Sequence, residues 1–361
     1  MRHRSTCWAT LFSLLSLGLA VQVTQGFANE PELIERFEAP SATQTLIVRS
    51  TADISIYAPV VEAFLETQSD LAIVYEQWGS NDLYSQTRQE CREDAPAADV
   101  VISSGVHQMV KLVNEACAQS HVSRETEQLP PALRWRDELW GITREPAVVV
   151  YNQELVPPDE VPKSRFDLLD LLRPTYTRYA GRIATYDIER SGLGYLFAFI
   201  DAQEASTFGA LQEAFVRTQA VLSCCSSDII RGVAEGRYLI AYNVLGSYAQ
   251  GYQQTDDRIG IVLPSDYTLV LSRALMIPKG VDNTAAAAEF LDFQLSRVGQ
   301  RALREALLIS PLLETEEGAE GETLSSTALR PIGLSPSLMV ARDQLTRETF
   351  LKRWRVTFPV P

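Results

Sequence analysis

Short loops rich in serine, threonine, asparagine and aspartate recur along this sequence, each directly after an apolar run. In the first third of the chain they contain Ser50-Thr51, Ser80-Asn81 and Ser103-Ser104. Such residues cap helix N-termini, because their side-chain oxygens accept a free amide of the first turn. Several helix N-termini at one place also favour an anionic ligand. Capping alone, and capping combined with ligand binding, both remain open at this point.

The second half of the chain repeats this pattern after residue 181. An apolar run at 182–186 precedes one polar loop, a helix pattern at 229–235 follows another, and a run at 238–243 leads into a third. The polar or small residues of these loops that we consider candidate ligand contacts are Asp187, Ser191, Gly192, Ser226, Asn243, Gly246 and Ser247.

The elements that must position these loops are strand–loop–helix units. The apolar runs at 45–50, 71–75 and 98–102 predict strands, and each is followed by a helical pattern with apolar residues three or four positions apart. Consecutive units of this kind predict an α/β fold, with a mostly parallel sheet and helices on both faces. Open sheets of this type bind ligands beyond the carboxyl ends of their strands.

Between the two series lies Gly141–Asn152, which combines an apolar run at 147–150 with the charged pair Arg144 and Glu145. The run is typical of a strand buried on both faces. Its position suggests a crossing between two lobes, with a return crossing near 269–277. Arg144 is our strongest single candidate for holding a carboxylate or phosphate, because a guanidinium pairs with both oxygens of such a group. A salt bridge to Glu145 or another acid is the alternative.

Composition limits the class of protein. The 361 residues suggest two domains or one large one, and the net charge of −14 argues against nucleic-acid binding. Residues 1–28 resemble a cleaved signal peptide: Arg2 and Arg4 precede an apolar run, and Gly26-Phe27-Ala28 offers small residues for cleavage near Ala28. We therefore expect a periplasmic protein.

Four cysteines follow the expected leader, and in an oxidising compartment they can pair in three ways. Cys91 and Cys117 fall near the ends of consecutive predicted helices, so we favour a disulfide between them. Cys224 and Cys225 are neighbours, and a bridge between them would strain the peptide. We expect them to be free thiols or packing residues.

The sequence gives little support for catalysis or a bound metal. After the leader only His107 and His121 remain, and there is no Cys-x-x-Cys spacing and no Gly-x-Ser-x-Gly elbow. We expect no catalytic residue, no metal site and no cofactor. An exported enzyme that uses paired carboxylates is a minor alternative.

Three segments together carry a family resemblance. Gly141–Asn152, Tyr238–Tyr248 and the segment 288–303, which contains Ser-Arg-Val-Gly-Gln, resemble periplasmic solute-binding proteins of ABC importers, in the iron(III), phosphonate and organophosphate branch. The resemblance covers roughly residues 40–312. It implies two α/β lobes joined by crossing strands, which close on a ligand by hinge motion.

The resemblance also implies a division of the chain. We expect residues 29–145 and 267–325 in lobe 1, residues 146–266 in lobe 2, and a helical extension, 326–361, packing on lobe 1. The expected ligand contacts in the cleft are Ser50, Thr51, Ser80, Asn81, Ser103, Ser104, Arg144, Asp187, Ser191, Gly192, Ser226, Asn243, Gly246 and Ser247.

One departure bears on the ligand. Iron-binding members of that branch use two adjacent tyrosines at the position of Asn243–Tyr248, where this chain has Asn-Val-Leu-Gly-Ser-Tyr. Ferric iron prefers hard anionic oxygens, so an organic acid, organophosphate or phosphonate is a better fit. We expect a monomer that delivers such an anion to an ABC permease. The alternatives are a ligand-sensing subunit for a membrane histidine kinase and, less favoured, a ferric-iron-binding protein.

Overall fold

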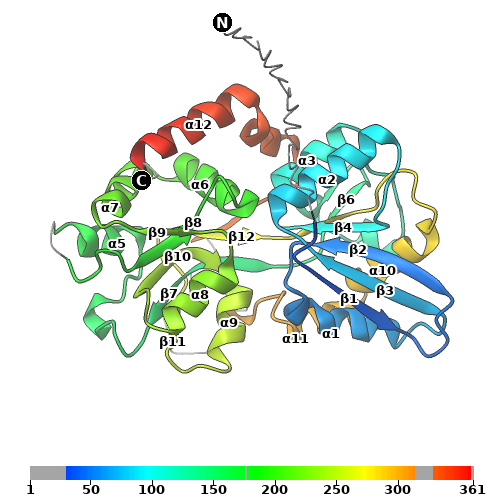
Figure 1. The fold of residues 1–361 in the computed structure, drawn as a ribbon, viewed down its shortest axis with the longest axis horizontal. Helices are drawn as coiled ribbons and strands as arrows, with labels where there is room; N and C mark the ends of the chain where they lie inside the picture. Colours follow the sequence, from blue (N-terminus) through cyan, green and yellow to red (C-terminus); the bar gives the residue numbers. More distant parts are fainter. Residues whose placement is uncertain (1–29, 175–176, 314–327, 359–361) are drawn as a thin grey trace, which may run out of the picture.

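The computed structural model describes residues 30–174, 177–313 and 328–358, so the expected signal peptide lies outside the described residues. Two lobes stand side by side, each with one seven-stranded sheet flanked by helices (Figure 1). In the described part of the chain, no helix has the length and apolar character needed to cross a membrane.

Lobe 1 is organised by the first strand–loop–helix units. Its sheet runs in the order β1-β3-β2-β4-β13-β6-β5. The apolar positions predicted for the first helix, among them Tyr57, Val61 and Phe64, are buried against this sheet. The elements are β1 (Leu33–Glu38), β2 (Gln44–Ser50), α1 (Ile54–Leu65), β3 (Leu71–Gln77), α2 (Ser80–Glu93), β4 (Val100–Ser103), α3 (Val106–Asn114), α4 (Arg124–Glu127), β5 (Arg134–Trp135), β6 (Leu139–Gly141), β13 (Ala274–Met276), α10 (Thr284–Leu295) and α11 (Arg297–Glu305).

Lobe 2 is organised by the second series of units. Its sheet runs β14-β12-β7-β10-β8-β9, with β11 also paired to β7. The elements are β7 (Glu145–Asn152), α5 (Arg165–Leu172), β8 (Ile183–Tyr186), α6 (Gly192–Glu204), α7 (Phe208–Arg217), β9 (Val221–Ser223), α8 (Ser226–Ala234), β10 (Ile240–Leu245), α9 (Gly246–Gln253), β11 (Ile259–Val262), β12 (Thr268–Leu271) and β14 (Leu329–Pro331).

Both sheets contain more antiparallel strand pairs than the mostly parallel arrangement that the sequence predicts. The strands that alternate with helices do pair in parallel, as in β3-β2-β4 and β10-β8-β9. Most of the remaining strands pair antiparallel because they either cross between lobes or return without a helix, so β7 runs antiparallel to β10, β11 and β12.

The lobes are joined where the chain leaves one sheet and enters the other. The first crossing runs from Gly141 at the end of β6 to Glu145 at the start of β7, and the second from Leu271 at the end of β12 to Ala274 at the start of β13. A third segment also connects the lobes. β14 pairs in parallel with β12 in lobe 2, and a few residues later the amide of Leu334 donates to the carbonyl of Ala132 in lobe 1.

The carboxyl-terminal extension does not pack only on lobe 1, which corrects that expectation. A 3₁₀ helix (Pro336–Arg342) contacts α3 of lobe 1, but the following helix α12 (Gln344–Thr357) contacts α7 and lies over lobe 2 (Figure 1). The cause is aromatic packing: Phe350 meets Tyr195, Phe199 and Phe208, and Trp354 is buried in the same cluster.

Candidate functional site

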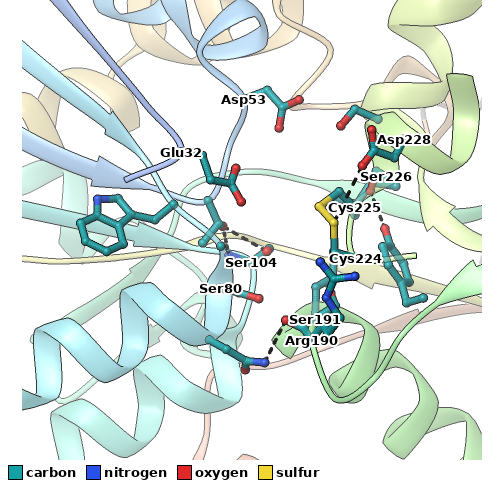
Figure 2. A pocket seen from close by; sticks show the side chains of 18 of the residues that line it. Glu32, Asp53, Ser80, Ser104, Arg190, Ser191, Cys224, Cys225, Ser226 and Asp228 are labelled. Carbon is teal, nitrogen blue, oxygen red and sulfur yellow. Dashed lines mark hydrogen bonds between the residues drawn. A yellow bond between two sulfur atoms is a disulfide. The ribbon is translucent and has the colours of Figure 1, made fainter. Parts of the chain in front are cut away.

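A cavity of about 600 Å³ lies between the lobes, at the carboxyl ends of β2, β3, β8 and β9. Both lobes contribute to its wall, which is mostly polar. The lining residues are Glu32, Thr51, Asp53, Gln77, Trp78, Gly79, Ser80, Asn81, Asp82, Ser104, Tyr186, Glu189, Arg190, Ser191, Leu193, Cys224, Cys225, Ser226, Ser227, Asp228, Leu245, Tyr248 and Arg273. Figure 2 shows part of this wall.

Lobe 1 presents the N-terminus of α2 to the cavity. Gly79 is its N-cap residue, so no side chain caps this helix end, and Ser80, Asn81 and Asp82 of the first turn line the wall. Amides of a first helical turn have no partner within the helix. This end of α2 can therefore donate hydrogen bonds to a ligand.

Lobe 2 presents the N-terminus of α8 in the same way. Its N-cap residue, Cys225, makes no side-chain cap, and Ser226, Ser227 and Asp228 line the wall. The hydroxyl groups of Ser226 and Tyr186 share a hydrogen bond of 2.5 Å. Burial raises the pKa of the Tyr186 phenol above its ordinary value, so this hydroxyl stays protonated.

The floor of the cavity contains a buried ion pair that links the two crossings. Arg273 donates from Nε to Glu145 Oε1 at 2.9 Å and from Nη2 to Oε2 at 3.3 Å, and both side chains are at most 1% exposed. Glu145 also accepts hydrogen bonds from the hydroxyls of Thr143 at 2.8 Å and Ser247 at 2.5 Å. Burial disfavours the charge of Arg273, but the attraction of Glu145 outweighs it and raises the pKa of the guanidinium.

Direct hydrogen bonds across the cleft show that the lobes are closed on each other. Asn81 donates from Nδ2 to the carbonyls of Glu189 and Arg190, each at 2.9 Å, and Ser80 accepts from the amide of Gly192 at 2.8 Å. On another side of the cavity, the Tyr248 hydroxyl donates to Asp53 Oδ1 at 2.8 Å.

Carboxylates outnumber cationic groups around the cavity. Its wall contains five acidic side chains, Glu32, Asp53, Asp82, Glu189 and Asp228, against Arg190 and Arg273. Some are already paired: Glu189 with Arg355, Asp228 with Arg231, and Arg273 with Glu145. In Figure 2, Glu32, Asp53 and Asp228 occupy one side of the view, and Ser80, Ser191 and Arg190 the other.

Six of the residues selected from the sequence line the cavity: Thr51, Ser80, Asn81, Ser104, Ser191 and Ser226. Several others shape its loops from behind. Ser50 and Ser103 accept from the amides of Ala52 and Gly105, each at 3.0 Å, and Asp187 accepts from that of Glu189 at 3.0 Å. Gly192 meets Ser80 through its amide, as described above.

The remaining four selected residues neither line the cavity nor shape the loops around it. Ser247 bonds Glu145, Asn243 donates to Asp201 at 2.5 Å in the core of lobe 2, and Gly246 packs against Pro146. Arg144 is exposed and joins Leu308 and Ser310 through its backbone. Successive side chains of an extended strand point to opposite sides, so with Glu145 buried at the floor, Arg144 points away.

Sequence reasoning did not select Arg273, Trp78, Tyr186 or Tyr248. Trp78 directly follows β3, at the sheet edge where ligand contacts were expected, so its position was a usable signal. Arg273 lies in the return crossing, and it offers the same guanidinium group as Arg144 in the first crossing.

The four cysteines within the described residues pair in two disulfides. One joins Cys91 to Cys117, the pairing favoured from the sequence. The other joins the neighbours Cys224 and Cys225, so the expectation of free thiols or packing residues is wrong. The loop between β9 and α8 accommodates the small ring that this bridge closes.

Comparison with known proteins identifies the family. The family model described as "Bacterial extracellular solute-binding protein" matches residues 95–333. This chain belongs to that family. The solute-binding protein is also 32% identical to a substrate-binding protein of an ABC transporter from Agrobacterium tumefaciens, with a TM-score of 0.83, covering 90% of this chain and 98% of the other.

More distant structures share the fold. AfuA, the periplasmic binding protein from Actinobacillus pleuropneumoniae in complex with fructose-6-phosphate, is 17% identical, with a TM-score of 0.68 over 89% of this chain and 100% of its own. A ferric binding protein from Campylobacter jejuni is also 17% identical, with a TM-score of 0.64 over 86% and 99%. No curated protein sequence matches the solute-binding protein.

Proposed function

We propose that this solute-binding protein captures a small, anionic, oxygen-rich solute between its lobes and delivers it, from the periplasm, to the permease of an ABC importer. The observation that carries this proposal is the pair of helix N-termini, α2 from lobe 1 and α8 from lobe 2, that open on one cavity without a side-chain cap. Free amides and the positive end of the helix dipole stabilise anionic oxygens.

The carboxylates narrow the ligand class. Asp53, Glu32 and Asp82 have no cationic partner among the ion pairs of the described residues, and they repel a bare anion. They can instead accept hydrogen bonds from hydroxyl groups. A hydroxylated organic acid or a sugar phosphate satisfies both features, because its charged oxygens suit the helix ends and its hydroxyls suit the carboxylates.

Ferric iron is a poorer candidate. A hard cation of this kind is held by deprotonated oxygens. Two tyrosines line the cavity, Tyr186 and Tyr248, and burial raises the pKa of both phenols above the ordinary value. Each is also hydrogen-bonded, to Ser226 and Asp53 respectively. The site therefore favours neutral phenols.

The proposal is tested by thermal unfolding and calorimetric titration with citrate, inorganic phosphate, glucose 6-phosphate, fructose 6-phosphate and ferric citrate. A ligand present at a hundred times its Kd stabilises the folded protein by about 2.7 kcal/mol, which is a shift of several degrees in Tm. We expect a shift with an organic anion. A shift with ferric citrate alone, and with no iron-free anion, would refute the ligand class.

A matched pair of variants tests the role of α2. Ser80→Asp places a negative charge at the helix end that faces the cavity, and we expect it to raise the Kd of the bound anion about tenfold or more, or about 1.4 kcal/mol. Ser85→Asp adds the same charge to an exposed position of α2 outside the cavity lining and should leave the Kd unchanged. If both variants raised the Kd equally, the effect of Ser80→Asp would come from the overall charge of the protein and not from the position of the new carboxylate.

A further inference from the structure

The disulfide between Cys224 and Cys225 lies in the wall of the cavity. The two residues follow β9 and precede α8, both side chains are only partly buried, and both line the cavity. Figure 2 shows the sulfur atoms at the cavity wall, between Ser226 and Asp228 on one side and Ser191 and Arg190 on the other. A ligand that fills the cavity must therefore pass close to them.

Global stability does not account for this bridge. A disulfide stabilises a protein mainly by restricting the unfolded chain, and the effect grows with the length of the closed loop. Cys91 and Cys117 are 26 residues apart, whereas Cys224 and Cys225 are adjacent, so their bridge closes almost no loop. Its consequences must be local.

Two local consequences follow from its position. The bridge ties Cys225, the N-cap residue of α8, into a small ring, so it fixes the backbone that aims the first-turn amides of Ser226 to Asp228 at the cavity. It also presents polarisable sulfur without a hydrogen-bond donor in a wall composed mostly of hydroxyls, amides and carboxylates. That surface suits the carbon face of a ligand and does not suit its polar groups.

We propose that the Cys224–Cys225 disulfide is a ligand-contacting part of the site and makes affinity depend on oxidation state. This inference rests on the proposed function. Reduction by a dithiol breaks the S–S bond: the disulfide takes up two electrons and two protons to give two thiols, and the dithiol becomes a cyclic disulfide. The ring then opens, the N-cap of α8 is released, and two weak donors replace the donor-free sulfur surface.

The experiment measures the Kd of citrate, glucose 6-phosphate and fructose 6-phosphate by calorimetry for four forms of the full chain. These are the oxidised protein, the protein reduced with dithiothreitol, the variant Cys224→Ser/Cys225→Ser, and the control Cys91→Ser/Cys117→Ser. Circular dichroism checks that each form is folded. Reduction also opens Cys91–Cys117, so the control variant is measured with and without dithiothreitol as well.

We expect about a tenfold rise in Kd on reduction and in Cys224→Ser/Cys225→Ser, no change in the oxidised control, and the same rise when the control is reduced. Re-oxidation should restore the original affinity. A probe that binds every form equally overturns the role of the disulfide but leaves the proposed function intact. Failure of all three probes to bind the oxidised protein overturns both.

Discussion

The buried pair of Arg273 and Glu145 gives the sharpest test of how the two crossings are held together. Replacing Arg273 by Met keeps much of the side-chain length and removes the charge. Glu145 would then remain fully buried, with only the hydroxyls of Thr143 and Ser247 as donors. Breaking one partner of a buried ion pair typically costs 3–5 kcal/mol, because the other charge is left uncompensated. Since two donors remain, we expect a loss of about 3 kcal/mol in the free energy of unfolding.

The double variant Arg273→Met/Glu145→Gln separates a lost charge from lost packing. Glutamine keeps the shape of Glu145 without the charge, so the double variant should be more stable than Arg273→Met alone by roughly 1 kcal/mol or more, because no uncompensated charge is left buried. Arg258→Met is the matched control, because Arg258 is exposed and forms a surface ion pair with Asp256, and it should show no measurable change.

The assay is urea unfolding, followed by tryptophan fluorescence and far-UV circular dichroism so that coincident curves establish two-state behaviour. A double variant as unstable as Arg273→Met would show that packing, not charge, determines the loss. An Arg273→Met protein as stable as the wild type would refute the reasoning altogether.

Two further predictions concern single residues. His107 is fully buried where α3 meets Tyr195 of α6, and burial, together with the charges of Arg342 and Arg347, holds the pKa of its imidazole well below the ordinary value. The folded protein therefore binds fewer protons at this ring than the unfolded chain, so stability falls as the pH drops below about 6.5, by up to about 1.4 kcal/mol per pH unit. Chemical unfolding at pH 7.5 and 5.5 should show a smaller loss for His107→Phe than for the wild type, and equal losses would contradict this. Arg144→Ala would weaken binding if Arg144 held the anion, as the sequence predicts, but it should leave the Kd unchanged because the side chain is exposed to solvent.

The general architecture was readable from the sequence because it depends on local patterns. Apolar runs followed by polar loops and helical patterns predicted the units around β2, β3 and β8, and two such series predicted two lobes. The surface on which the last helix packs could not be predicted in this way. Its apolar positions showed an amphipathic helix, but Phe350 and Trp354 fit any apolar surface, and only the folded lobes show that Tyr195, Phe199 and Phe208 form the one that receives them.

The sequence alone does not show which of two arginines, Arg144 or Arg273, lies at the cavity. Each arginine lies in a crossing, and the pattern gives both the same chemistry. In a strand with one solvated face, alternation would reveal which neighbour points inward. Here β7 is buried along nearly its whole length, so the apolar pattern after Glu145 contains no such signal. The decision comes from pairing between crossings: the amide of Arg273 bonds Thr143 Oγ1 at 2.8 Å, which places Thr143, Glu145 and Arg273 together at the floor of the cavity and leaves Arg144 on the opposite side.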